Sequence, residues 1–218
     1  METKINKNQI AGAIKILNVV ENGSLTRNGA VYSGFSSSNY LQIGDKVNDG
    51  YISLANAVKD FGAVCETADS WKVKMKFKYV AGGTADMQTI FNMNTAYGSQ
   101  ISIQTSSSKL LWQFSTSGSG SSISGGDEIG TTTLVDGNTY WITFEFTGTA
   151  YQVSLSTDGI NFELEKEPTA STEKLSNRAT WIIGTMISDS RNFLGEIDIE
   201  GWEIEVDGSI WWKGVEQI

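Results

Sequence analysis

Residues Trp71 to Tyr79 alternate strictly between an apolar side chain and a lysine. Successive side chains of a β-strand point to opposite faces of its sheet, so the run predicts a strand with one apolar face and one lysine face. A row of lysines is also what a nucleic-acid-binding strand would carry. We favour a solvated face, because a lysine stem tolerates a strand and its charge discourages unwanted strand pairing. The run therefore predicts a sheet with one buried side.

Glycine-containing pairs punctuate the rest of the chain. Asn-Gly, Asp-Gly and Gly-Gly pairs supply the positive φ angles that tight hairpins require. The pairs are Asn28-Gly29, Asp49-Gly50, Gly82-Gly83, Asp136-Gly137, Asp158-Gly159 and Asp207-Gly208. Their regular spacing predicts short antiparallel strands joined by turns.

Runs of alternating polarity between these turns give the predicted strands. They are 101–103 paired with 110–114, the hairpin 140–146 with 151–155, 160–164, and the late strands 181–187, 193–199, 202–206 and 210–212. More than ten short strands without a long helical pattern predict an all-β fold, a two-sheet antiparallel jelly-roll sandwich. The Ser/Gly-rich segment 115–126 is interpreted as a loop within one domain, because neither half of the chain holds enough strands to close a core.

The first 25 residues differ from the rest. Ile10, Ala13, Ile14 and Leu17 lie at helical spacing, whereas Gly12 and the neighbouring β-branched residues lower helix propensity. Two interpretations stay open: a docking segment that fastens the domain to a larger body, or a flexible tail with one strand. We therefore divide the chain into a short N-terminal extension, 1–25, and a jelly-roll domain, 26–218.

Composition excludes several classes of function. The chain carries a net charge of −9, which opposes a phosphate-binding face, so nucleic acid is not an expected partner. It has no histidine, which removes Ser-His-Asp and Cys-His triads and His-ligated metals. Its single cysteine, Cys65, forms no internal disulfide and is expected to be a small buried residue. No signal peptide and no membrane-spanning apolar stretch are recognised.

The motif Glu196-Ile197-Asp198-Ile199-Glu200 resembles the catalytic strand of family-16 glycoside hydrolases, which are also jelly rolls. The resemblance implies Glu196 as nucleophile, Glu200 as acid/base and Asp198 as the residue that tunes them. The alternative is a strand whose acidic side faces water. Retaining hydrolysis needs carboxyls about 5–5.5 Å apart, whereas positions i and i+4 of a regular strand lie about 13 Å apart. We therefore expect no catalytic residues and no enzyme.

A second resemblance covers far more of the chain, about residues 30 to 215. Segments 32–41, 140–142 with 153–159, and 193–198 with 204–214 resemble, in this order, strands of laminin-G/concanavalin A-like modules, especially those of tailed bacteriophages. The resemblance implies a twisted two-sheet sandwich whose rim loops often bind glycans, sometimes with calcium.

Ligand candidates follow from this resemblance. Asp127, Glu128 and Asp136 are candidate calcium ligands, although no closely spaced series of oxygen ligands is visible and a plain polar loop is the favoured interpretation. Otherwise no cofactor is expected. Trp141 is the candidate sugar-stacking residue; burial in a core or interface is the alternative.

The function predicted from the sequence is a non-enzymatic virion component of a tailed phage with a lectin-like sandwich. It would be a head-decorating, fibre or tail-appendage protein that contacts other virion proteins through its N-terminal segment and binds host-surface glycans. Such proteins are usually symmetric homo-oligomers, and a trimer is expected. A virion protein leaves the host cell by lysis and needs no signal peptide or membrane contact. The alternatives are a family-16-like glycoside hydrolase and a carbohydrate-binding module unrelated to phages.

Overall fold

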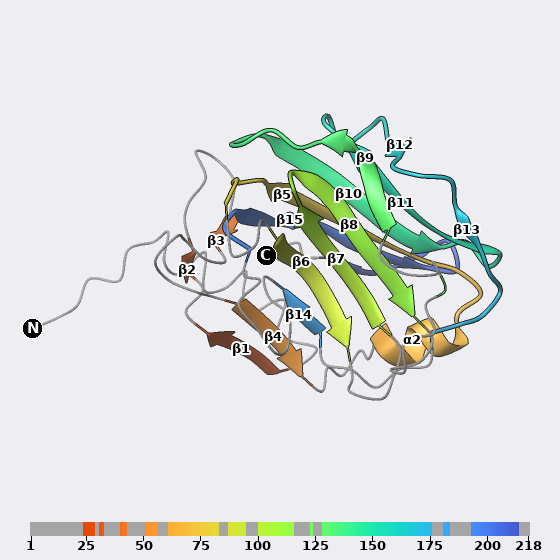
Figure 1. Cartoon of the computed structure of the whole chain (residues 1–218). Helices are drawn as coiled ribbons and strands as arrows, with labels where there is room; N and C mark the ends of the chain where they lie inside the picture. The colour runs from red at the N-terminus through yellow and green to blue at the C-terminus, as the bar shows by residue number, and fades with distance from the viewer. Residues whose placement is uncertain are drawn as a thin grey trace, which may run out of the picture.

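The computed structural model of the chain describes residues 24–28, 31–32, 40–42, 51–55, 61–82, 87–94, 100–115, 123, 128–175, 181–183 and 193–213. Side chains are described for 64–82, 87–92, 101–115, 123, 128–175, 193–197 and 201–211. Two antiparallel sheets lie face to face in this part of the chain (Figure 1). The prediction of a two-sheet jelly-roll sandwich is confirmed.

The first sheet has seven strands in the order β1-β4-β14-β6-β7-β8-β9. Their bounds are β1 Ser24–Asn28, β4 Tyr51–Ala55, β14 Trp181–Ile183, β6 Met87–Asn94, β7 Gln100–Ser106, β8 Lys109–Ser115 and β9 Glu128–Thr133. The hairpin of β7 and β8 was predicted, whereas β6 and β9 were not. Residues 1–23 lie outside the described residues, so the role of the N-terminal extension stays a prediction, and β1 already begins at Ser24.

The second sheet has nine strands. Seven follow the order β12-β11-β10-β5-β15-β3-β2, with β13 beside β11 and β16 beside β15. Their bounds are β2 Val31–Tyr32, β3 Tyr40–Gln42, β5 Trp71–Lys78, β10 Thr139–Phe146, β11 Ala150–Ser156, β12 Glu163–Leu164, β13 Thr169–Ala170, β15 Glu196–Val206 and β16 Ser209–Lys213. The long central strands β10, β5 and β15 run side by side, and they carry the face described below.

Strand β15 differs from the prediction. Two strands were expected in its place, 193–199 and 202–206, but the structure has one strand with a register shift between Asp198 and Glu203. Those two residues pair with Lys76 and Lys74 of β5, so three extra residues of β15 are accommodated between the two pairs. Gly201 lies within this irregular stretch, and a Cβ there would come within 2.6 Å of the Lys76 Cβ. The irregularity therefore depends on a close approach of the β15 backbone to β5.

The core lies between the two sheets and is aromatic. Phe144 of β10 meets Phe91 of β6 across the sandwich, with ring centroids 5.0 Å apart. Phe114 of β8 and Tyr151 of β11 make a second such contact at 5.1 Å. Burial raises the pKa of Tyr151, whose hydroxyl donates to the Glu173 carbonyl at 2.7 Å. The inward residues predicted for β5 and β10 are all buried. Burial alternates strictly along β5, whereas in β10 Thr143, on the opposite side, is buried as well.

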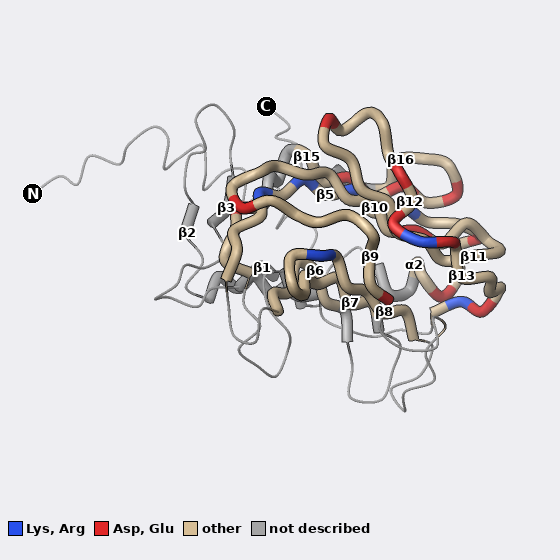
Figure 2. Tube along the Cα trace, turned by 45° about the horizontal axis from the view of Figure 1, so that its top comes forward, with Lys and Arg blue, Asp and Glu red and all other residues tan. Residues whose placement is uncertain are grey.

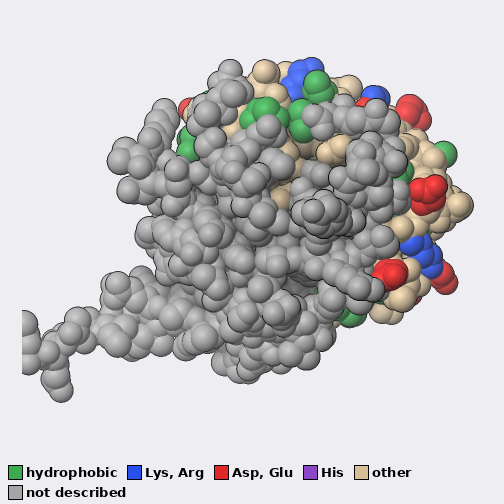
Figure 3. Space-filling model, turned by 60° about the horizontal axis from the view of Figure 1, so that its bottom comes forward, with side chains coloured by type: hydrophobic (Ala, Val, Ile, Leu, Met, Phe, Trp, Pro, Cys, Tyr) green, Lys and Arg blue, Asp and Glu red, His purple; other side chains and the backbone are tan. Residues whose placement is uncertain are grey.

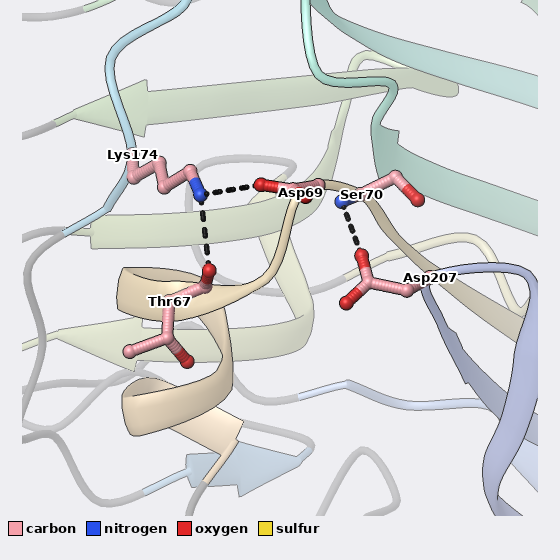
Figure 4. Close-up of polar contacts among 5 residues, drawn as sticks. All are labelled: Thr67, Asp69, Ser70, Lys174 and Asp207. Carbon is pink, nitrogen blue, oxygen red and sulfur yellow. Dashed lines mark hydrogen bonds and ion pairs between the residues drawn. The ribbon is translucent and has the colours of Figure 1, made fainter.

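A short helix, α2 (Phe61–Thr67), precedes β5 and was not predicted. It carries Cys65, which is fully buried and unbonded to another cysteine, as expected. The junction of α2 and β5 is held from two distant segments (Figure 4). The Lys174 ammonium donates to the Thr67 carbonyl at 3.0 Å and to Asp69 Oδ1 at 3.1 Å, while the Ser70 amide donates to Asp207 Oδ1 at 2.8 Å. Among the residues described, no helix is long and apolar enough to cross a membrane.

Candidate functional site

The outer face of the nine-stranded sheet is built on the four lysines of β5, Lys72, Lys74, Lys76 and Lys78, hereafter the lysine row. Strict alternation places all four on this face, opposite the buried apolar residues of the same strand. The sequence predicted a solvated lysine face. The structure places all four lysines on the outer face, where each is partly exposed.

Acidic residues of β15 lie opposite the lysine row, one for each lysine. The backbone register pairs Glu196 with Lys78, Asp198 with Lys76, Glu203 with Lys74 and Glu205 with Lys72. The Lys78 ammonium lies 3.6 Å from Glu196 Oε1, and on the β10 side the Lys72 ammonium lies 3.6 Å from Glu145 Oε2. Figure 2 shows basic and acidic positions along these strands. The face therefore carries both signs of charge in matched positions.

Trp141 of β10 stands beside the lysine row, opposite Lys76. The Lys76 ammonium lies 5.1 Å from the centroid of the Trp141 ring, within the range of a cation–π contact. A Cβ at Gly159 would come within 2.9 Å of the indole atoms Cε2 and Nε1, so the backbone of this glycine lies against the ring. The indole is half-buried and fixed between these two neighbours, yet keeps part of its surface in solvent.

The turn after β11 lies against Trp141. Asp158 organises it by accepting hydrogen bonds from the amides of Ile160 and Asn161, both at 2.8 Å, and from Asn161 Nδ2 at 2.7 Å. These bonds, led by that of the Asn161 amide, hold the pKa of Asp158 well below its usual range. The ionised carboxylate thus fixes the turn that carries Gly159.

Lys74 joins this turn to the sheet. Its ammonium donates to the Gly159 carbonyl at 3.2 Å and lies 5.1 Å from the centroid of the Phe162 ring. Reasoning from the sequence found Trp141 but missed the parts played by Gly159, Lys74 and Phe162. The Asp158-Gly159 pair was recognised as a turn, but no local pattern shows that the turn lies against the tryptophan of the preceding strand.

The proposed hydrolase motif begins on the same face, and Glu196 is the one acidic residue of the motif whose side chain is among those described. Glu196 Oε2 is buried without a hydrogen-bond partner, and Oε1 faces Lys78. Burial raises the pKa of Glu196, and the opposing effect of Lys78 is smaller. Glu196 lies on the outer face of the sheet beside Lys78, with 19 % of its side chain exposed. The side chains of Asp198 and Glu200 lie outside the described residues.

The regular-strand spacing used against catalysis holds only for the first part of this motif. Glu196 and Asp198 pair with alternate residues of β5, as in an ordinary ladder. Glu200 falls within the irregular stretch that follows. The spacing between Glu196 and Glu200 is therefore not that of a regular strand.

The candidate calcium ligands are used in other contacts. Glu128, at the start of β9, forms an ion pair with Lys166. Asp136, beyond the other end of β9, accepts a hydrogen bond from the Ala81 amide at 2.8 Å. Glu128 pairs with Trp112 of β8 and Thr133 pairs with Lys109, so Glu128 and Asp136 lie toward opposite ends of this paired stretch. Asp127 lies outside the described residues, and among those described no group of three acidic, cysteine or histidine side chains could hold a metal ion.

Known proteins resemble this chain in fold but not in sequence. No known family profile matches it, and no curated protein sequence matches it. The LG1–3 region of the laminin α2 chain has 12% identity to it and a TM-score of 0.54, over 82% of this chain and 33% of that one. Domain 4 of AbnA, a GH43 arabinanase from Geobacillus stearothermophilus solved with arabinotriose, has 16% identity and a TM-score of 0.53, over 88% and 86%. The fold is a laminin-G-like, concanavalin A-like jelly roll.

A third jelly roll of this kind lies in the binding domain of botulinum neurotoxin DC, solved in complex with SialylT. It has 10% identity and a TM-score of 0.56, over 84% of this chain and 42% of that one. The chain thus spans about two fifths or less of the laminin and neurotoxin chains but most of the arabinanase domain. At these identities the likeness concerns the concanavalin A-like fold alone.

Proposed function

We propose that this chain is a non-catalytic carbohydrate-binding module carried on the particle of a tailed phage. The observation that carries the binding role is Trp141, a half-exposed indole held rigidly at the centre of a face built on strands. Sugars present C–H faces that pack on aromatic rings and hydroxyls that need donors and acceptors nearby. A ring that is already fixed loses little conformational freedom when a ligand packs on it.

The charged groups around Trp141 supply the polar part of such a site. Lys76 and Lys74 are donors close to the ring, and Glu203, which pairs with Lys74, is an acceptor on β15. The arabinanase domain solved with arabinotriose and the neurotoxin domain solved with SialylT share this fold. These complexes support a saccharide as the ligand class to test first.

The proposed absence of catalysis is supported by the state of Glu196. A retaining hydrolase needs one carboxylate free to attack and a second one close by as the acid. Glu196 instead lies in an ion pair with Lys78 and has one oxygen buried. Incubation with β-glucans, carrageenan and agarose is expected to release no new reducing ends. Release of reducing ends that is lost in Glu196→Gln would establish the hydrolase alternative.

A glycan array followed by calorimetry on the best ligand tests the binding role. Trp141→Ala is expected to weaken binding about tenfold or more, the effect of removing an aromatic anchor worth about 1.4 kcal/mol or more. Ile160→Ala is the matched control, because Ile160 lies on the adjacent turn with 82% of its surface exposed. Absence of any glycan binding by the full chain, with its fold verified by circular dichroism, would refute the proposal.

The particle location is tested separately. The phage-like order of the segments identified in the sequence supports it, and portal, capsid or tail genes on either side of the coding gene are the expected finding. The trimer is part of the same proposal, and light scattering on the purified chain measures it. A gene neighbourhood without any phage structural gene would favour a carbohydrate-binding module unrelated to phages.

A further inference from the structure

The charge of the face around Trp141 narrows the class of saccharide. The lysine row has four positive charges. Five acidic residues flank it: Glu145 on β10 and Glu196, Asp198, Glu203 and Glu205 on β15. Every lysine therefore has at least one acidic residue in register beside it, and the face as a whole has no excess of positive charge.

This balance of positive and negative charges determines the affinity of the face for a charged ligand. A carboxylated or sulfated sugar is bound where cations outnumber anions, because its desolvation must be offset by attraction. The whole chain adds to the repulsion, since its net charge is −9. In the view of Figure 3 the described side chains lie along the upper and right rim, and both basic and acidic ones occur there. An anionic ligand therefore gains nothing from the long-range field.

The same arrangement suits a neutral ligand. A hydroxyl group both donates and accepts, so a pair of neighbouring hydroxyls is matched by an ammonium next to a carboxylate. Lys74 and Lys76 provide ammonium groups within reach of Phe162 and Trp141, and the register places Glu203 and Asp198 opposite these two lysines. An aromatic surface bordered by alternating donors and acceptors is complementary to an uncharged sugar ring.

Resting on the carbohydrate-binding role above, we infer that the face formed by Trp141 and the lysine row takes neutral saccharides and discriminates against carboxylated and sulfated ones. The discrimination comes from the acidic residues of β15. Their removal leaves the lysine row in excess and opens the same face to acidic sugars. The preference for neutral over acidic sugars therefore depends on the pairing of β5 with β15 and not on Trp141.

The experiment uses an array of matched glycan pairs in which each backbone is present in a neutral form and in a carboxylated form. The full chain is expected to bind neutral members and to bind their carboxylated partners at least about tenfold more weakly, a difference of about 1.4 kcal/mol. For a neutral ligand the affinity is expected to stay constant when salt is raised to about 1 M, where the Debye length is about 3 Å.

The double variant Glu203→Gln, Glu205→Gln tests the cause. It is expected to reduce or abolish the discrimination, with carboxylated glycans gaining affinity and that affinity falling with salt. The matched control is Glu163→Gln, which removes an exposed carboxylate on β12 of the same sheet and is expected to leave the neutral preference intact. An unchanged preference in the double variant would overturn the assignment of specificity to β15.

The outcomes separate this inference from the function on which it rests. Preference of the full chain for carboxylated or sulfated members of the pairs would overturn the inference and leave carbohydrate binding established. Binding of neutral glycans that Trp141→Ala does not weaken would place the site elsewhere and overturn it as well. Absence of binding to every glycan of the array would refute the carbohydrate-binding role itself.

Discussion

The backbone of Gly159 lies against the indole of Trp141, and this contact links the turn after β11 to the strand before it. Gly159 has a φ of +77°, in the left-handed region that favours glycine, and a Cβ added there would come within 2.9 Å of the ring. The turn and the tryptophan are therefore fitted to each other, so a change in either is transmitted to the other.

Gly159→Ala is predicted to destabilise the protein by about 2–3 kcal/mol, because the strain of a positive φ adds to a clash with the indole. Gly208→Ala is the control. Gly208 has a similar φ of +74° but nothing within 4 Å of an added Cβ, so only the backbone cost of about 1–2 kcal/mol is expected. Urea unfolding measures both. Equal losses in the two variants would show that the contact with Trp141 contributes nothing.

The sequence predicted the buried faces of β5 and β10 because apolar residues recur at every second position of both strands. The irregularity of β15 was missed, although its signal is present in the sequence. The acidic residues occupy even positions up to Glu200 and odd positions from Glu203, so the alternation of the sequence shifts by one position near Gly201. The acidic residues that pair with β5 nevertheless all lie beside its lysines. A shift of this kind was interpreted as a gap between two strands. A bulge within one strand produces the same pattern, and only the pairing with β5 distinguishes them.

The candidate site could be predicted only in part, for a related reason. Trp141 was identified because it is an aromatic residue offset from the inward-facing residues of β10. Its neighbours Lys76 and Gly159 come from other elements, and which residues meet across a sheet depends on register. Register is fixed by the packing of the whole sandwich and not by the local sequence. The charge matching between β5 and β15 could therefore not be predicted from the sequence.

The raised pKa of Glu196 predicts how the stability of the protein depends on pH. Burial raises the pKa of Glu196 above its ordinary value of 4.5, so the folded state holds this proton more readily than the unfolded state. Its contribution to stability is therefore full below about pH 4 and is lost as the pH rises through the raised pKa. Glu196→Gln removes the ionisable carboxyl group and therefore also removes this loss of stability at higher pH.

Relative to the wild type, Glu196→Gln is thus expected to gain stability as the pH rises above about 4, as measured by urea unfolding at a series of pH values. At neutral pH the variant should be at least as stable as the wild type, because burial outweighs the ion pair with Lys78. Glu205→Gln controls for removing one charge from β15. A variant that loses stability as the pH rises would show that the ion pair dominates.

The edge of the sandwich at β9 and β12 depends on a buried carboxylate. Glu165 is 1% exposed, and its Oε2 accepts a hydrogen bond from the Thr132 amide at 3.0 Å. Its own amide donates to the Val153 carbonyl at 3.0 Å, so the residue joins the two sheets at this edge. Gly130 makes room for the carboxylate, because a Cβ there would overlap it.

Glu165→Ala is predicted to cost about 1–3 kcal/mol, since it leaves the Thr132 amide without its acceptor. Glu163→Ala, on the same edge but exposed, should stay within about 0.5 kcal/mol of the wild type. Hydrogen exchange adds a local measure: the Thr132 amide is expected to exchange faster in Glu165→Ala only. Unchanged protection of this amide would show that the carboxylate does not hold the edge.

Strand β6 carries two buried amide side chains, of which one is hydrogen-bonded through both its oxygen and its nitrogen and the other has no hydrogen-bond partner. Gln88 donates from Nε2 to the carbonyls of Val80 at 2.6 Å and Gly82 at 2.8 Å, and its Oε1 accepts from the Leu194 amide at 3.0 Å. Asn92 is equally buried, but neither its Oδ1 nor its Nδ2 has a partner in the structure. Because a buried polar group costs free energy only when its hydrogen bonds are unmade, the two residues are expected to differ sharply in substitution.

Asn92→Leu replaces an unpaired amide by an apolar side chain of similar size, so we predict unchanged or increased stability, by up to about 2 kcal/mol. Gln88→Leu leaves three backbone groups without partners and should cost about 2 kcal/mol or more. Urea unfolding of both variants measures the difference. A loss at Asn92 comparable to that at Gln88 would mean that the Asn92 amide is hydrogen-bonded in solution, by water or by a ligand, and that this face of the seven-stranded sheet is a polar site in its own right.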